Sequence, residues 1–239
     1  MIYTLFPYVI FIFQTLLMPI FKNKDNFAHK NTLNHRDILH LSDELVINRG
    51  SERTCYRHPK DTKLVIKVPI STAGKKAEAN HNELKGYRIL REEGIDLSFV
   101  SHCYGFVNTD QGQGLVCDCI RDDDGAISKT IWDTVVFQDD CDVGHILEIT
   151  ETFCDFLISN RIWIFDLNLK NIVLKQLTDG TCKPYIIDVK GRYVNYELIP
   201  FSRYIPYLSL QKLRRRSSQL LQRITEYHRR REELQMMEG

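Results

Sequence analysis

The segment IFDLNLKNIVL most strongly constrains what this chain can fold into. Within it, Asp166 and Asn171 flank four residues, and the apolar run 172–174 follows directly. Both polar side chains must then sit on one tight loop held by a strand on each side. A carboxylate and an amide placed in this way can orient a hydroxyl group and ligate a metal ion. The spacing alone is weak evidence, because it often occurs by chance.

Further polar positions stand in a fixed order around this loop. Upstream, the turn Gly50–Ser51 lies between two predicted strands, the strand LVIKV carries Lys67, and the next predicted helix carries Glu83. Downstream, the apolar run YIID ends at Asp188. This is the order in protein kinases of the phosphate-covering loop, the strand lysine, its glutamate partner, the catalytic loop and the metal-site aspartate. Each position alone has an ordinary structural explanation, but the ordered set favours a protein-kinase-like fold.

The kinase interpretation gives each polar residue a predicted role in binding ATP and Mg²⁺ and in transferring a phosphoryl group. Lys67 would hold the α- and β-phosphates, and Glu83 would fix the position of Lys67. Asp166 would orient the acceptor hydroxyl, and Lys170 would contact the γ-phosphate unless it simply faces solvent. The predicted metal ligands are Asn171 and Asp188.

Several departures from active protein kinases leave turnover open. The loop 50–53 has one glycine where the pattern G-x-G-x-x-G has three, so its backbone would cradle phosphates less well. Ile164 and Phe165 replace the H-R pair before Asp166. Only 48 residues follow Gly191, with no A-P-E motif, which favours a compact or unusual acceptor over a peptide in the usual groove. The alternative to an ATP-dependent phosphotransferase is a catalytically inactive pseudokinase that acts as a regulatory binding module.

Hydrophobic periodicity divides the chain into two differently built parts. The pattern predicts an α+β architecture with two lobes, a β-rich N-lobe and a mostly helical C-lobe. The C-lobe helix 143–160 should direct Ile146, Ile149, Phe153, Phe156 and Leu157 inward. Other expected elements are strands within 41–59, 63–70, 99–110 and 114–125, a helix over 75–93 ending at Gly94, and a helix over most of the last 40 residues. The predicted domain limits are 41–120 for the N-lobe and 121–239 for the C-lobe.

The N-terminal segment 1–21 carries no charge and is mostly apolar, which is long enough to span a bilayer. Lys22 and Lys24 follow, so the segment could anchor a cytoplasmic domain to the inner membrane. The alternative is a mis-assigned start upstream of the true domain. Residues 22–40 are polar without a clear period and are interpreted as a linker.

Composition narrows the kinds of site and of partner that the chain could have. Seven cysteines without a CxxC pair argue against a zinc site or a disulfide framework and are typical of a reducing cytosol. The acidic run 122–124 is interpreted as a solvated loop rather than a cation site. The basic tail 203–231 is either a solvated helix or a contact for an anionic partner such as phospholipid, and no motif supports nucleic acid.

From about Leu41 to Ile224 the sequence resembles the bacterial YrbL family of PhoP regulatory network proteins. The stretches that carry the resemblance are LSDELVINRGSERTCYRHPKD, VIKV, NELKGYRIL, YGFVNTDQGQGLVCDCIRDDDG and SNRIWIFDLNLKNIVL. The resemblance implies a kinase-like fold and expression under a two-component system that responds to low magnesium or acid stress. It names no phosphate acceptor, whether protein or small molecule, and no partner.

Overall fold

The computed structural model describes residues 38–138, 141–164, 166–189 and 206–238. The chain separates into two compact units, 1–34 and 35–239, and all described residues belong to the second. The predicted membrane segment 1–21 and nearly all of the predicted linker therefore lie outside the described residues. Ordered pairing begins slightly before Leu41, because the N–H of Leu39 donates to the carbonyl of Asn108 at 3.0 Å.

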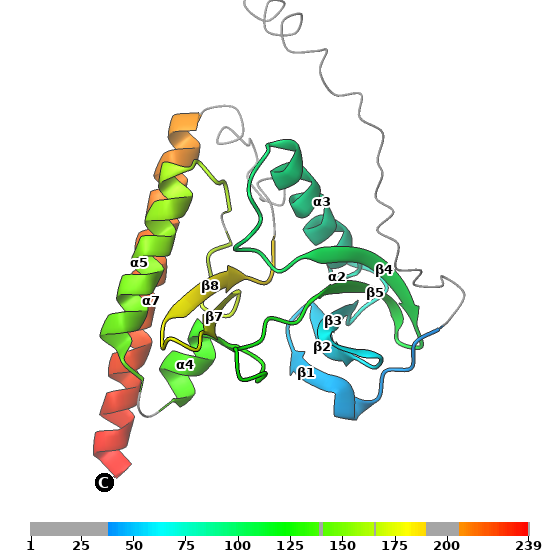
Figure 1. The fold of residues 1–239 in the computed structure, drawn as a ribbon, viewed down its shortest axis with the longest axis horizontal. Coiled ribbons are helices and arrows are strands. Elements are labelled where there is room, and N and C mark those ends of the chain that lie inside the picture. The colour runs from blue at the N-terminus through cyan, green and yellow to red at the C-terminus, as the bar shows by residue number, and fades with distance from the viewer. Residues whose placement is uncertain (1–37, 139–140, 165, 190–205, 239) are drawn as a thin grey trace, which may run out of the picture. The chain divides into compact units, whose positions relative to one another are not determined.

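The N-lobe is built on a five-stranded antiparallel sheet in the order β1-β2-β3-β5-β4 (Figure 1). Its strands are β1 (Val46–Arg49), β2 (Arg53–His58), β3 (Asp61–Pro69), β4 (Cys103–Thr109) and β5 (Gly112–Asp118), preceded by the 3₁₀ turn η1 (Asp43–Leu45). The long central strand β3 is exposed where it begins and buried over 65–68. The buried second half of β3 lies against the helix that follows it in the chain.

The predicted helix over 75–93 is interrupted at Glu78, which leaves a short α2 (Gly74–Ala77) and a longer α3 (Ala79–Glu92). Helix α3 packs on β3 and β4. It ends as predicted at Gly94, whose φ of +71° suits glycine. There the Gly94 N–H donates to the Arg91 carbonyl and the Ile95 N–H donates to the Leu90 carbonyl, each at 3.0 Å. This pair of hydrogen bonds is a Schellman motif.

Within its described residues, the C-lobe combines three helices with a small antiparallel sheet in the order β6-β7-β8. Its elements are β6 (Lys129–Thr130), α4 (Ile131–Phe137), α5 (Val143–Ser159), β7 (Ile172–Gln176), β8 (Cys182–Ile186) and α7 (Pro206–Glu238). A reciprocal capping box between Thr130 and Asp133 starts α4. Helices α5 and α7 lie side by side (Figure 1), so the predicted helical tail is part of the lobe.

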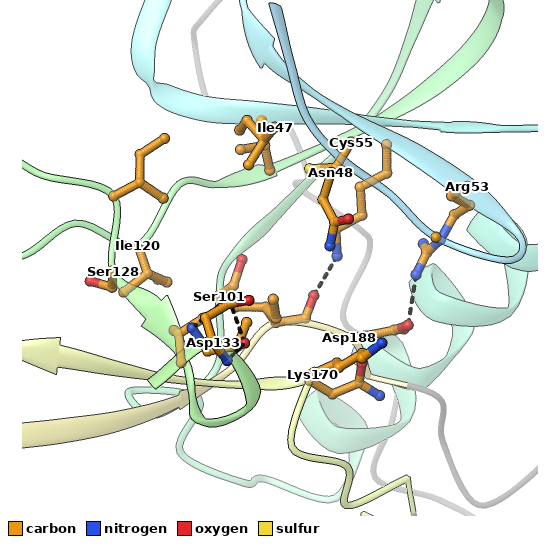
Figure 2. A pocket seen from close by; sticks show the side chains of 18 of the residues that line it. Ile47, Asn48, Arg53, Cys55, Ser101, Ile120, Ser128, Asp133, Lys170 and Asp188 are labelled. Atoms are coloured by element: carbon orange, nitrogen blue, oxygen red, sulfur yellow. Dashed lines mark hydrogen bonds and ion pairs between the residues drawn. The ribbon is translucent and has the colours of Figure 1, made fainter. Parts of the chain in front are cut away.

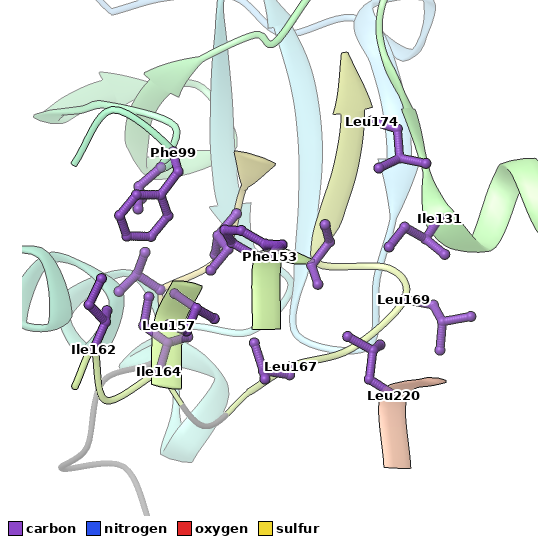
Figure 3. Packing of buried hydrophobic residues seen from close by; sticks show 14 of the residues in the cluster. Phe99, Ile131, Phe153, Leu157, Ile162, Ile164, Leu167, Leu169, Leu174 and Leu220 are labelled. Atoms are coloured by element: carbon purple, nitrogen blue, oxygen red, sulfur yellow. The ribbon is translucent and has the colours of Figure 1, made fainter. Parts of the chain in front are cut away.

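The main core includes buried residues from both lobes and from α7 (Figure 3). Leu213, Leu220 and Ile224 of α7 are at most 1% exposed, whereas Leu210 and Leu221 are half-buried. The basic charges of this helix are partly used within the protein. Arg231 donates to the Val135 carbonyl at 3.0 Å and also to the Gln138 carbonyl at the end of α4, while Arg229 and Arg230 pair with Glu233 and Glu226 on α7 itself.

The predicted inner face of α5 is partly wrong. Ile146, Phe153 and Leu157 are buried, but Phe156 is 40% exposed and packs edge-on against Phe99 with ring centroids 5.2 Å apart. Thr150 and Cys154 are buried in addition. The reason is rotational, since positions four, seven, eight and eleven residues after Ile146 share a face while Phe156 falls beside it.

The acidic run has a structural task that the sequence interpretation missed. Asp122 accepts hydrogen bonds from the Ser128 hydroxyl at 2.6 Å and the Gln176 N–H at 2.8 Å, and Asp123 pairs with Lys175 at 2.9 Å. These carboxylates fasten the loop after β5 to β7. Across the described ranges, no cluster of three or more His, Cys, Asp or Glu could hold a metal ion, and no helix is long and apolar enough to cross a membrane. No disulfide joins any of the seven cysteines, which all lie within the described residues.

Candidate functional site

A cavity of about 950 Å³ opens between the strands of the N-lobe and the loops of the C-lobe (Figure 2). The end away from Arg53 carries Ile47 and Ile120, beside Ser128 (Figure 2), and the lining also includes the apolar residues Cys55, Val65 and Val173. Burial raises the pKa of the Cys55 thiol to about 11, so this side chain stays neutral near pH 7 and behaves as a small apolar group. The other end is polar, and every residue predicted for the site except Glu83 lines the cavity: Gly50, Ser51, Lys67, Asp166, Lys170, Asn171 and Asp188.

The predicted lysine–glutamate contact forms at the polar end. Lys67 lies on the buried half of β3, and its Nζ is 2.7 Å from Oε1 of Glu83 on α3, which is fully buried. The side-chain amide of Asn80, one turn before Glu83, donates to the Lys67 carbonyl at 2.8 Å and ties helix to strand. Burial alone would lower the pKa of Lys67, but the charge of Glu83 outweighs it and raises the pKa above its usual range. Lys67 also donates to the Ile187 carbonyl, beside Asp188.

Arg53 is the residue at this end that motif reasoning missed. It is the first residue of β2, just after the predicted phosphate loop, where the Gly50 N–H closes the turn on the Arg53 carbonyl at 2.9 Å. From there its guanidinium pairs with Glu83 and also reaches Asp188, with Nη2 2.8 Å from Oδ2 (Figure 2). Burial opposes the charge, but both carboxylates hold the pKa of Arg53 above its ordinary value. The only feature of the sequence that pointed to this role was a positive charge next to a turn with a single glycine, Gly50.

The loop bearing Asp166 and Asn171 is fixed by an alternation of buried and polar residues. Leu167 and Leu169 are buried in the main core, while the residues between and after them face the cavity. The Asn171 side-chain amide lies 3.5 Å from the Asp166 carbonyl, and the Ile187 N–H donates to the Asn171 carbonyl at 2.9 Å. These bonds hold the loop against the segment that carries Asp188. The predicted loop and metal-site residues are thus brought to one wall of the cavity.

Lys170 meets an aromatic ring. Its Nζ lies 4.4 Å from the ring centroid of Trp132 on α4, within cation–π distance, although the side chain as a whole is exposed. Trp132 in turn packs edge-on against Tyr227 of α7, with centroids 4.7 Å apart. The structure therefore places Lys170 at the edge of the cavity on an aromatic support, and its role toward a phosphate stays a prediction.

The turn Gly50–Ser51 lies over the cavity between β1 and β2, as predicted. Gly50 does not adopt a positive φ, and a Cβ there would lie 3.3 Å from the Arg53 carbonyl oxygen, so the close turn rather than backbone strain favours glycine. Lys190 and Gly191, which follow Asp188, lie outside the described residues, as does Phe165.

The chemistry of the polar end suits a metal ion only in part. Oxygens of Asn171 and Asp188 are ligands of the kind that Mg²⁺ prefers. However, Asp188 Oδ2 already accepts from the Arg53 guanidinium. A metal ion at this carboxylate would lie close to the Arg53 guanidinium, and the two positive charges would repel each other, so the arrangement suits a kinase-type metal site only in part.

The sheet with its α3 helix, the lysine–glutamate pair and the D-x-x-x-x-N loop together define a protein-kinase-like fold, as predicted. Comparison of sequences then identifies the family. The chain belongs to the YrbL family, because the family model described as PhoP regulatory network protein YrbL matches residues 39–225.

Two relatives and one solved structure are similar to this chain with low sequence identity. Uncharacterized protein YrbL of Escherichia coli (strain K12) and that of Shigella flexneri are each 28% identical over 182 residues, covering 74% of this chain and 84% of the relative. An apo pseudokinase structure is 10% identical with a TM-score of 0.40, covering 64% of this chain. The chain spans 63% of the length of that pseudokinase chain.

Proposed function

We propose that this member of the PhoP regulatory network family binds ATP in the cavity between its lobes. The observation that carries the proposal is the buried Lys67–Glu83 ion pair, 2.7 Å long, at the polar end of a cavity whose other end is apolar. An ammonium group held by a carboxylate is the arrangement that positions nucleotide phosphates in kinases. The cavity volume of about 950 Å³ is also within the range of small-molecule sites.

The two ends of the cavity suit the two ends of a nucleotide. The apolar walls at Ile47, Val65 and Val173 can enclose a flat base, which loses water on binding. The polar end offers the cations of Lys67 and Arg53, and a triphosphate needs cations to leave water. Burying those cations without carboxylate partners would be costly, which explains why Glu83 is fully enclosed.

Phosphoryl transfer belongs to the same proposal. Asp166 would orient the hydroxyl of a protein or small-molecule acceptor. Mg²⁺ would supply charge neutralisation at the phosphates, with Asn171 and Asp188 as its oxygen donors. At Asp188 the metal ion would share the carboxylate with Arg53, whose guanidinium pairs with Oδ2.

Calorimetric titration of the purified protein with ATP, with Mg²⁺ and with EDTA, tests the binding proposal. Wild type should bind ATP, and Lys67→Met should weaken binding by at least about tenfold, the effect of losing one charge-assisted contact. The matched control is Lys63→Met on the same strand, where the side chain is exposed. If wild type binds no ATP in either buffer, the proposed function is wrong.

A second candidate function is a pseudokinase that regulates a partner by binding. The Arg53–Asp188 ion pair favours it, because it occupies the carboxylate on which transfer depends. The two functions differ in what an Asp166→Asn strain does. A binding module keeps its cellular effect in that strain with the protein folded, whereas a phosphotransferase loses it.

We also propose that residues 1–21 tether the domain to the inner membrane, on the strength of their uncharged, mostly apolar sequence. Fractionation of cells that express the full chain should recover it with membranes, and a version starting at Leu41 should be released. Recovery of the full chain in the soluble fraction would end this idea.

A further inference from the structure

The guanidinium of Arg53 pairs with Asp188, the carboxylate with which a kinase would hold a metal ion. We propose that this guanidinium is the resident cation of the phosphate end, so that nucleotide binding, unlike phosphoryl transfer, requires no divalent metal. The inference rests on the proposed function and specifies how that site recognises phosphate. The ligand class is therefore a nucleoside triphosphate whose binding needs no metal, because Arg53 contacts its phosphate oxygens.

The position of Arg53 is strongly determined. Its side chain is 10% exposed, and it bridges two elements that a kinase site must align, the helix carrying Glu83 and the segment carrying Asp188. Nη1 contacts Glu83 and lies 3.2 Å from the Asn80 side-chain oxygen, while Nη2 lies 2.8 Å from Asp188. Figure 2 shows this arginine reaching from the strands toward Asp188. A side chain bonded in this way is preorganised rather than free to swing.

The guanidinium retains the capacity to bind phosphate in this position. It carries five N–H donors in a planar fork, and its contacts reach three acceptor groups, so donors remain for phosphate oxygens. Arginine stays charged and matches phosphate geometry with two parallel bonds, which a lysine cannot do. Together with Lys67, it places two cations at the polar end.

The same geometry disfavours a metal ion. Asp188 Oδ2 is shared with Arg53, and a divalent cation beside a guanidinium would be repelled at close range. A metal ion that displaced Arg53 from Oδ2 would also disturb the bonds of this nearly enclosed side chain to Glu83 and Asn80. Mg²⁺ also gives up its own water reluctantly. The balance therefore favours the arginine as the cation at this carboxylate.

Calorimetric titration with ATP in EDTA and in Mg²⁺ tests the inference on the full chain. Wild type should bind ATP with affinities within about threefold of each other in the two buffers. Arg53→Gln should weaken binding in EDTA by at least about tenfold, the loss of a charge-assisted contact. The matched control is Arg57→Gln on the same strand, where the side chain is exposed and donates to the Glu44 carbonyl; it should bind like wild type.

A second variant keeps Arg53 and guards against a folding defect in Arg53→Gln. Asp188→Asn removes a negative charge beside the phosphates and frees the guanidinium, so its affinity for ATP in EDTA should rise severalfold. A fall would overturn the inference. Binding by wild type in Mg²⁺ alone would also overturn it while leaving the proposed function standing. No binding by wild type in either buffer would overturn both.

Discussion

Replacing Glu83 by glutamine should destabilise the whole protein, because this one carboxylate neutralises two buried cations. Its side chain is fully enclosed, with Oε1 2.7 Å from Lys67 Nζ and Oε2 bonded to Arg53. Glutamine has the same shape but only one acceptor oxygen. Its NH₂ group must therefore face either the ammonium or the guanidinium, donor against donor. Asp188 remains as the partner of Arg53, so one cation is left without its carboxylate.

The size of the effect follows from this burial. Removing one partner of a buried ion pair costs about 3–5 kcal/mol. For a protein of this size each kcal/mol lowers Tm by about 2–4 °C, so Tm should fall by roughly 6–20 °C. Arg53→Gln in the same chain removes the excess charge, and the double variant should recover at least about 1 kcal/mol relative to the sum of the two single variants.

Thermal and urea unfolding followed by far-ultraviolet circular dichroism would measure both quantities. The control is Glu92→Gln, which changes the same chemical group on the same helix at an exposed position and should shift Tm very little. A Glu83→Gln protein that melts within a degree of wild type would refute the account of the ion network. So would a double variant whose loss equals the sum of its parts.

Two further predictions concern the core and pH. Leu220→Ala in α7 should cost about 2–5 kcal/mol in urea unfolding because this side chain is 1% exposed, while Leu234→Ala, 60% exposed, should change little; equal effects would contradict the packing of α7. Burial lowers the pKa of His58 below 6.5, so the unfolded chain takes up the proton first and stability falls as pH drops through about 6.5. His58→Gln should flatten that pH dependence, and an unchanged slope would exclude His58 as its source.

The contacts that were predictable from sequence depend on local order. Lys67 stands on a strand and Glu83 on the next helix, so the fold brings them together once strand and helix pack. The D-x-x-x-x-N loop was likewise predictable, because Leu167 and Leu169 pin it to the core. Each of these rests on short spacing or on element order, which a single sequence displays.

Arg53 was not predictable because its partners are distant in sequence and unrelated to any motif. Its contact with Asp188 joins a hairpin to a segment of the other lobe, and no periodicity reports on such a pair. The contacts of the acidic run 122–124 were not predictable for the same reason, since their partners Lys175 and Gln176 come from another strand. The prediction that Phe156 faces inward was wrong for a different reason, because a few degrees of helix rotation decide which apolar residue is enclosed.

The packing of α7 has a consequence for how the protein is made. This helix follows all other described elements in the chain, yet it supplies Leu213, Leu220 and Ile224 to the main core and, through Arg231, closes the end of α4. While the ribosome is still translating it, the surfaces of α4 and α5 that it covers are exposed to solvent. The N-lobe sheet can form early from neighbouring strands, but the core of the C-lobe cannot be completed until α7 has been synthesised. Nascent chains arrested before residue 206 should therefore be the ones that chaperones hold.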